Sequence, residues 1–445
     1  MKHNSKIPEN IYAKRRAQIL AQIKGEAALF CALPEKGRER DMYYEFQQDA
    51  NLYYLTGIEE PQTALLMLGS NTKPRSILFL REKDPYKEQW QGVRLGLKIA
   101  KAQIKVDLVL DIASLKTELP KFLAPYPCLH YTPGVDVKLD QFILSLAQTL
   151  NAPRCNFPSA FVDARLLTAP LRWVKDKEEI KRLKQAAAIT AISFYEVGIN
   201  LRNFATELHC AKALEEKFYK YGATRLAFPS IVAAADHATY LHHVPQKTPL
   251  KSGGLVLIDA GANVNGYCAD VTRTFPLSGK FSKPQAQIYQ AVYRALQTGI
   301  KKARPGVTMS MIHQAVVKDI CASLAVLKII KSSAAKIEKD KSYQRYFMHR
   351  AGHWLGLEAH DISPIVTSFP QVHGYDLKLV PGNVLTMEPG LYFDPGDKSV
   401  PQEYRGLGIR LEEDILITKA GRDVLTDCIP IKLTDIENIC TGRLL

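Results

Sequence analysis

Apolar residues in the first third of the chain fall into short runs separated by polar and turn-forming residues, a pattern typical of a mixed α/β domain. Residues 8–24 predict a helix, and the apolar runs predict strands at residues 27–32, 52–56, 64–68 and 76–80. Because these runs carry their own apolar surface, we expect this part of the chain to have its own hydrophobic core.

A long amphipathic pattern follows. Residues 173–199 have an acidic start, a basic continuation and apolar positions at helical spacing, which together predict one long helix. A stretch bearing several prolines, residues 153–170, precedes it, so we place a domain boundary at Arg172. The chain has 445 residues, and at about 150 residues per domain this length allows two or three domains. We therefore expect an N-terminal domain at 1–172 and a second domain at 173–445.

Two apolar, β-branched-rich runs within residues 255–275 flank a turn-like segment and predict a β-hairpin. If the strands pair symmetrically about the midpoint between Val264 and Asn265, Asp259 faces Asp270, with Cβ atoms roughly 5 Å apart. Opposed like charges destabilise a sheet unless one carboxyl has a raised pKa or a cation lies between them. The alternative is that one Asp is a turn residue and the other a solvated strand position.

Three histidines, His349, His353 and His360, fall within twelve residues of a chain that has 11 in total. Neutral imidazole is a metal ligand and a proton-transfer group near neutral pH. A single histidine in such a segment is more often a hydrogen-bonded structural residue, but three together favour a functional site.

Two further acids lie in patterned segments near the C-terminus. Glu388 lies in an apolar stretch before a Pro-Gly break, and Glu412 lies in a strand-like segment whose alternation places Arg410, Glu412 and Asp414 on one face. The alternative for Glu412 is a simple ion pair with Arg410.

Taken together, these segments supply four carboxylates and one imidazole. Such an oxygen-rich set suits divalent ions such as Mn²⁺, Co²⁺ or Zn²⁺, and bridging carboxylates can hold two ions together. We infer a dinuclear metallohydrolase whose candidate ligands are Asp259, Asp270, His353, Glu388 and Glu412.

The composition of the chain indicates in which cellular compartment the protein resides. No run approaches the roughly 20 apolar residues that cross a bilayer, and the N-terminal segment lacks the apolar core of a signal peptide. The eight cysteines are scattered without a CxxC pair, which predicts reduced thiols. We expect a cytoplasmic protein with no membrane partner.

The net charge of +14 raises the possibility of nucleic-acid binding, because a basic surface attracts phosphates. The basic excess is divided between the two expected domains, however, and no basic stripe is interleaved with aromatic residues. We therefore expect a solvated surface and no nucleic-acid partner.

Several of these segments carry a family resemblance. The chain resembles the Xaa-Pro aminopeptidase (aminopeptidase P) branch of the pita-bread metallopeptidases, which also include prolidase, methionine aminopeptidase and creatinase. The resemblance implies an α/β (α+β) protein with an N-terminal mixed α/β creatinase-like domain and a C-terminal pita-bread catalytic domain. The matching segments are AFPSIVA (227–233), Leu241-His242, IDAGANVNGYCADVTRTFP (258–276), MHRAGHWLGLEAHD (348–361), MEPGLYF (387–393), YRGLGIRLEEDILIT (404–418) and, in the first domain, residues 38–68 and the stretch around Trp90.

The resemblance implies two divalent metal ions, most readily Mn²⁺, with Co²⁺ or Zn²⁺ as alternatives. In the family pattern Asp259 chelates one ion, Asp270 and Glu412 bridge both, and His353 and Glu388 each complete the shell of one ion. A hydroxide between the ions is then the nucleophile. Glu388 is also implied to shuttle protons.

The same resemblance assigns residues around the metals. His242 and His360 match imidazoles that contact the substrate and stabilise the oxyanion. His349 and Tyr392 match substrate-binding positions, and Arg410 matches a residue that orients carboxylates or receives the far end of the substrate.

The chain also departs from the family pattern. His243 follows His242 where the family usually has Tyr, and His237 stands where the family commonly has Asn. Glu358 and Ser363 are further changes beside His360. The pattern leaves open what these four substitutions do.

The function implied is removal of the N-terminal residue from peptides with proline second. Such a bond lacks the amide N–H that ordinary peptidases use, so a dedicated pocket is needed. An Xaa-Pro dipeptidase shares every metal ligand, although Trp354 after His353 favours the aminopeptidase. A catalytically inactive pita-bread binding protein is the alternative from another class. The family also implies a homodimer or homotetramer, in which Trp90 approaches a neighbouring subunit.

Overall fold

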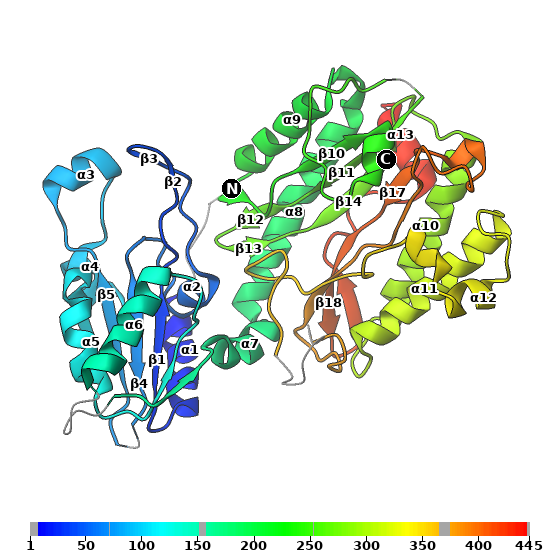
Figure 1. Ribbon diagram of the computed structural model, residues 1–445. Helices are drawn as coiled ribbons and strands as arrows, with labels where there is room; N and C mark the ends of the chain where they lie inside the picture. Colours follow the sequence, from blue (N-terminus) through cyan, green and yellow to red (C-terminus); the bar gives the residue numbers. More distant parts are fainter. Residues whose placement is uncertain (1–7, 71, 151–156, 252, 365–373, 443–445) are drawn as a thin grey trace. The chain divides into compact units, whose positions relative to one another are not determined.

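The computed structural model describes residues 8–70, 72–150, 157–251, 253–364 and 374–442 (Figure 1). By internal contacts the chain divides between Arg172 and Trp173 into two compact units. Within the described ranges, no helix is long and apolar enough to cross a membrane.

The first unit contains a six-stranded mixed sheet in the order β6-β5-β4-β1-β7-β8. β4 pairs antiparallel with β1 and β5, while β6, β7 and β8 join in parallel. The strands are β1 (Ala27–Cys31), β4 (Ala64–Leu68), β5 (Arg75–Leu80), β6 (Leu108–Asp111), β7 (Cys128–His130) and β8 (Ala160–Val162), and β2 (Gly37–Glu39) and β3 (Met42–Tyr43) form a separate hairpin.

The unit also contains helices, most of which lie beside this sheet (Figure 1). They are α1 (Glu9–Gln22), α2 (Ala50–Thr56), α3 (Pro85–Gln91), α4 (Gly96–Gln103), α5 (Leu115–Leu123), α6 (Val137–Leu150), α7 (Arg165–Trp173) and the 3₁₀ turn η1 (Ile112–Ser114). The core of the unit lies between β1, β4, β5 and β7 and the helices α5 and α6.

The predicted first helix and the strands predicted at 27–32, 64–68 and 76–80 are confirmed. The strand predicted at 52–56 is wrong, because this segment is the helix α2. The carboxylate of Asp49 caps its first turn by accepting the N–H groups of Asn51 and Leu52, and Gly57 ends it in the left-handed conformation. All residues from Asn51 to Thr56 are buried, so the apolar run carries no helical periodicity.

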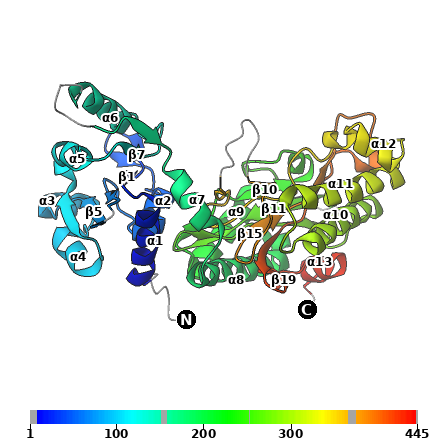
Figure 2. The ribbon, with the colours of Figure 1, turned by 90° about the horizontal axis from the view of Figure 1, so that it is seen from below.

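The second unit is built from two helix pairs and short antiparallel sheets. α10 and α11 lie side by side in both views, whereas α8 packs along β12 and β13 (Figures 1 and 2). The helices are α8 (Lys177–Ile199), α9 (Glu207–Lys220), α10 (Lys283–Lys302), α11 (Met309–Val326), α12 (Ala334–Lys339), α13 (Leu433–Cys440) and the 3₁₀ turns η2 (Leu201–Asn203), η3 (Ala235–Thr239), η4 (Ser342–Arg345) and η5 (Gln402–Tyr404).

The sheets of this unit are β10-β11-β14, β13-β12-β9, β15-β18-β19 and the pair β16-β17. Their strands are β9 (Arg225–Leu226), β10 (Ile231–Ala234), β11 (Leu255–Ala260), β12 (Ala262–Val264), β13 (Tyr267–Cys268), β14 (Val271–Pro276), β15 (Val384–Met387), β16 (Gly390–Tyr392), β17 (Gly408–Arg410), β18 (Glu413–Thr418) and β19 (Gly421–Val424). One large apolar core joins both helix pairs to these sheets.

The long helix predicted at 173–199 is present as α8, but it begins at Lys177. Asp176 and Glu179 form a capping box there, which fixes the start of the helix, while Trp173 ends α7. The strand-like segment around Glu412 is divided into β17 and β18, with residues 411–412 between them.

The predicted hairpin exists, but its predicted register is wrong. Asp259 pairs with Thr272 rather than Asp270, and the tip of the turn is Asn265-Gly266. Both turn residues have positive φ, 50° and 89°, as a two-residue type I′ turn requires. Asp270 therefore lies diagonal to Asp259 on the same face, still within reach across the ladder.

Candidate active site

A pocket of about 610 Å³ opens in the second unit. Its lining comes from the segment around β10 and η3, from the β11–β14 hairpin and from residues 349–412. Nine of the ten residues predicted for the site line this pocket: His242, Asp259, Asp270, His349, His353, His360, Glu388, Arg410 and Glu412. The tenth, Tyr392, bonds two of them from β16.

At the floor of the pocket, Asp270, His353 and Glu412 each present one potential ligand atom, and the three atoms lie within 4.8 Å of one another. His353 Nε2 is 3.5 Å from Asp270 Oδ2 and 3.7 Å from Glu388 Oε1. Four of the five predicted metal ligands therefore converge on one small volume.

The fifth predicted ligand, Asp259, faces the same floor from β11. Its Oδ2 accepts a hydrogen bond from Arg410 Nη2 at 2.6 Å. Its Oδ1 is buried and accepts no hydrogen bond from any described residue. An ionised oxygen left in this state is costly, and a cation is the partner that such an oxygen suits.

Side chains behind the floor hold the carboxylates in place. The Thr272 hydroxyl donates to Glu412 Oε2 at 2.7 Å and accepts from Arg410 Nε at 3.2 Å. The backbone N–H of Asp270 donates to Asp414 Oδ2 at 3.1 Å. Fixed orientation of a carboxylate by such neighbours is typical of metal sites.

The crowding of buried acids perturbs their protonation. Burial, with the nearby Glu412 carboxylate, raises the pKa values of Asp270 and Glu388 well above their usual range. Burial and the charge of Asp259 raise the pKa of Glu412 to about 8. Without added positive charge the site must therefore hold protons, whereas divalent ions would neutralise the same oxygens.

His353 is prepared as a ligand rather than as a cation. Its Nδ1–H donates to the carbonyl of Trp354 at 3.1 Å, so the lone pair of Nε2 faces the carboxylates. Burial and the neighbouring His360 lower the pKa of His353 to about 3, which keeps the ring neutral. The rings of His353 and His360 stack with centroids 4.0 Å apart.

A second wall of the pocket is a chain of hydrogen bonds. Arg410 Nη1 donates to the Tyr392 hydroxyl at 3.0 Å, and that hydroxyl lies 2.9 Å from His349 Nε2. His349 Nδ1 donates to the carbonyl of Arg350 at 2.7 Å, so Nε2 accepts from Tyr392. Burial and the charge of Arg410 lower the pKa of His349 to about 3.

Sequence reasoning missed Glu207, the first residue of α9. Its side chain is fully buried and accepts four N–H groups, at 2.8 Å from Ala234, 2.8 Å from His237 Nδ1, 2.9 Å from His243 Nε2 and 3.1 Å from Gln246. The two histidines that depart from the family pattern therefore share one carboxylate. We call Glu207 with these four donors the Glu207 clamp. It holds both ends of the segment that carries His242.

The buried ion pair of Lys175 and Asp361 was also missed. Lys175 Nζ is 3.1 Å from Asp361 Oδ2, and each side chain is 1% exposed. Because Asp361 follows His360 directly, the pair anchors the backbone that presents His360 to the pocket. The alternating pattern carried no signal for Lys175, which lies in the loop before α8.

Comparison with known proteins defines the class of this site. Residues 181–419 match the model of metallopeptidase family M24, and residues 12–130 match that of the aminopeptidase P N-terminal domain. The chain therefore has the architecture of an M24 metallopeptidase with an added N-terminal domain, which confirms the predicted fold class.

The similarity extends over the full length. The chain is 34% identical to Xaa-Pro aminopeptidase of Haemophilus influenzae over 98% of both chains, and 34% identical to that of Escherichia coli over 97% of this chain and 98% of the other. The structure matches zinc-substituted E. coli aminopeptidase P in complex with product, with TM-score 0.93 and 32% identity over 99% of this chain and 100% of that one. Pseudomonas aeruginosa aminopeptidase PepP matches with TM-score 0.92 and 32% identity over 98% of each.

The chain belongs to the Xaa-Pro aminopeptidases of metallopeptidase family M24. The predicted enzyme class, a metal-dependent aminopeptidase, is confirmed, and it is favoured over the dipeptidase alternative.

Proposed function

We propose that this chain removes the N-terminal residue from peptides whose second residue is proline, with two divalent ions held by Asp259, Asp270, His353, Glu388 and Glu412. The observation that carries the proposal is the convergence of these five side chains on the floor of one pocket. The full-length similarity to Xaa-Pro aminopeptidases supports the choice of substrate.

The donor set fits divalent ions. Four carboxylates and a neutral imidazole suit Mn²⁺, which we propose as the native ion, and also accept Co²⁺ or Zn²⁺. Asp270 and Glu412 would be shared between the two ions, as the family pattern implies. When bound, the ions would lower the pKa of a water molecule and polarise the scissile carbonyl.

The surrounding residues would manage protons and position the peptide. Glu388 faces the pocket, so it can take a proton from the attacking water and pass it to the leaving proline nitrogen. His242 and His360 line the same pocket and can donate hydrogen bonds to the developing oxyanion.

Arg410, Tyr392 and His349 act as one unit in this proposal. Their hydrogen-bond chain fixes the wall beside Glu388, since His349 Nδ1 lies 3.6 Å from Glu388 Oε2. A rigid wall of this kind suits the ring of a proline, which lacks an N–H and therefore needs recognition by shape.

The test compares a tetrapeptide Xaa-Pro-Yaa-Zaa with a dipeptide Xaa-Pro, using metal-stripped protein before and after Mn²⁺ is restored. We expect Mn²⁺-dependent release of the first residue from the tetrapeptide. Glu388→Ala should abolish it, and Glu403→Ala, at an exposed acid of the same unit, should not. Cleavage of the dipeptide alone would identify a dipeptidase. Failure with Mn²⁺, Co²⁺ and Zn²⁺ would support the binding-protein alternative.

We also propose that the chain forms dimers or tetramers through exposed apolar residues of the first unit. Tyr86 and Trp90 on α3 are 71% and 75% exposed, and Val93 is 82% exposed. Clustered exposed apolar side chains often mark interaction surfaces. Light scattering should show an oligomer that Trp90→Ala shifts toward monomer, and a monomeric wild-type protein would contradict this proposal.

We propose a cytoplasmic location and two domains, 1–172 and 173–445. All cysteines within the described ranges are free thiols, which suits a reducing compartment. Each unit also has its own apolar core. Expression of residues 173–445 alone tests the boundary, because an independent domain should unfold cooperatively.

A further inference from the structure

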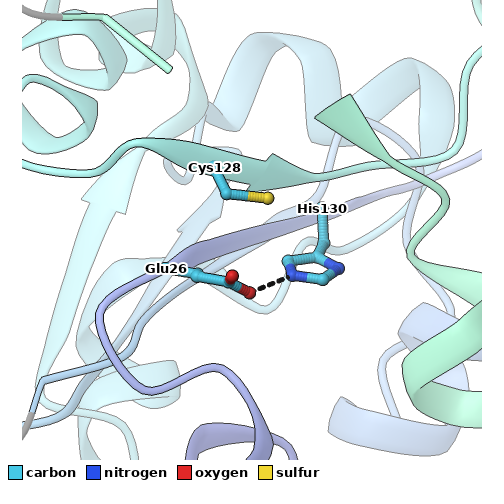
Figure 3. A group of neighbouring side chains, drawn as sticks. All are labelled: Glu26, Cys128 and His130. Carbon is cyan, nitrogen blue, oxygen red and sulfur yellow. Dashed lines mark hydrogen bonds and ion pairs between the residues drawn. The ribbon is translucent and has the colours of Figure 1, made fainter. Parts of the chain in front are cut away.

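Three side chains of the first unit form a polar cluster that the peptidase reaction does not use. Glu26 directly precedes β1, and Cys128 and His130 lie on β7 (Figure 3). Residues two apart on a strand share a face, so Cys128 and His130 point the same way. β1 and β7 run parallel with Ala27 beside Leu129, which brings Glu26 next to Cys128.

The potential ligand atoms of these residues lie close together. One oxygen of Glu26, the sulfur of Cys128 and one ring nitrogen of His130 all lie within 4.8 Å of one another, as do the atoms of Asp270, His353 and Glu412 in the active site. Figure 3 shows the three polar ends gathered together. Bonds from Zn²⁺ are roughly 2.0 Å to nitrogen or oxygen and 2.3 Å to sulfur, so only small movements would be needed.

The hydrogen bonds of the cluster leave His130 incompletely satisfied. Its Nε2 is 2.6 Å from Glu26 Oε2, but its Nδ1 is buried and has no hydrogen-bond partner among the described residues. An ion at this position would bind Nε2, the nitrogen that faces Glu26, and Nδ1 would then carry the ring proton.

The cluster also has an open side. Cys128 and His130 are each 7% exposed, whereas the side chain of Glu26 is 39% exposed. An ion can therefore enter past Glu26, and a water molecule can occupy the fourth tetrahedral position. Burial and the charge of Glu26 raise the pKa of the Cys128 thiol, so the free thiol stays protonated and unreactive until a cation displaces its proton.

We propose that Glu26, Cys128 and His130 form a mononuclear site for a thiophilic divalent ion, Zn²⁺ by the chemistry of its ligands. Thiolate, imidazole and carboxylate together favour Zn²⁺ over Mn²⁺, because Mn²⁺ prefers oxygen donors. The site would join β1 to β7, two adjacent strands in the interior of the six-stranded sheet. Its role would be to stabilise the first unit.

Cobalt provides a selective test, because a thiolate bound to Co²⁺ gives a near-ultraviolet charge-transfer band. The active-site set of carboxylates and one imidazole contains no sulfur and gives no such band. Full-length protein, first saturated with Mn²⁺, is titrated with Co²⁺. We expect the band to rise with added Co²⁺ to a plateau and to disappear when Zn²⁺ is added.

Variants assign the band to the cluster. Cys128→Ser should abolish it and His130→Gln should weaken Co²⁺ binding at least tenfold, whereas Cys31→Ser, at a thiol on β1 of the same sheet, should leave it intact. Mn²⁺-dependent peptidase activity should persist in all three, and a far-ultraviolet circular dichroism spectrum like that of the wild-type protein should show that the first unit folds. Absence of the band from wild-type protein in excess Co²⁺, or its survival in folded Cys128→Ser, would overturn the proposal.

Discussion

The Glu207 clamp allows a sharp test, because replacing one oxygen by nitrogen changes its hydrogen bonding and little else. In Glu207→Gln, the amide NH₂ must face either Ala234 N–H or Gln246 N–H. The imidazole on that side, His237 or His243, can change tautomer and accept a hydrogen bond. A backbone N–H cannot, so one buried donor loses its acceptor whichever way the amide turns.

The expected cost follows from these contacts. An unsatisfied buried donor costs about 1–3 kcal/mol, and the remaining bonds lose the gain from a charged acceptor. We therefore expect Glu207→Gln to lower the free energy of unfolding by about 2–5 kcal/mol, a large part of the roughly 5–15 kcal/mol typical of a domain.

Urea unfolding of metal-free protein measures this change without a contribution from metal binding. In a Trp90→Phe background the remaining tryptophans, Trp173 and Trp354, both report on the second unit. Glu216→Gln, at an exposed carboxylate on the same helix α9, is the matched control and should change stability by less than about 0.5 kcal/mol. Equal values for Glu207→Gln and this control would refute the reasoning.

Activity and pH give independent readouts of the clamp. Because the clamped segment carries His242, kcat/KM should fall about 10- to 100-fold in Glu207→Gln while metal affinity is unchanged.

Burial alone would raise the pKa of Glu207, but the N–H groups of Ala234, His243 and His237 outweigh it and lower the pKa. A lowered pKa gives stability that is present above the unfolded-state value and lost as pH falls through the folded-state value. Acid should therefore destabilise wild-type protein more than Glu207→Gln.

Three further outcomes are expected. Burial raises the pKa of Glu412 to about 8, so metal-free protein should lose stability as pH rises through that value. For the same reason, metal binding should release protons and become tighter between about pH 6 and 8. Calorimetric titrations with metal in two buffers of different ionisation enthalpy measure the proton release, and finding none would contradict this prediction. Arg410→Lys should lower kcat/KM about 10- to 100-fold, because a lysine cannot hydrogen-bond the Asp259 carboxylate, the Thr272 hydroxyl and the Tyr392 hydroxyl at once. A loss smaller than about threefold would show that these three contacts of Arg410 do not matter for catalysis. Gly352→Ala should destabilise by about 1–3 kcal/mol in urea unfolding, since its Cβ would lie 2.0 Å from the Thr386 carbonyl oxygen, whereas Gly37→Ala meets open space and should be neutral.

The residues at the site could be predicted because short sequence segments are enough to show which side chains could bind a metal. Carboxylates and histidines in apolar surroundings, such as Asp259 and His353, need a reason to be buried, and a metal supplies it. Nine of the ten predicted side chains line one pocket.

Other features depend on interactions that the alternating pattern does not encode. The hairpin register was mispredicted by placing the turn one residue early, although the Asn265-Gly266 pair was the signal for a type I′ turn. Leu52 lies in a helix because Asp49 and Gly57 cap it, and a short apolar run cannot show that. The role of Glu207 could not be predicted, because its partners His237 and His243 are far from it in sequence and only the fold places them in contact.

The Asn265-Gly266 turn also limits which insertions and deletions in the gene leave a working site. Because side chains alternate between the faces of a strand, inserting or deleting one residue between the turn and Asp270 would move that carboxylate to the opposite face. Gly261, which follows the last pair of the β11–β14 ladder, leaves no space for an added side chain, since a Cβ there would lie 1.7 Å from the carbonyl oxygen of Ala269. Single-codon insertions and deletions in the hairpin should therefore be eliminated by selection.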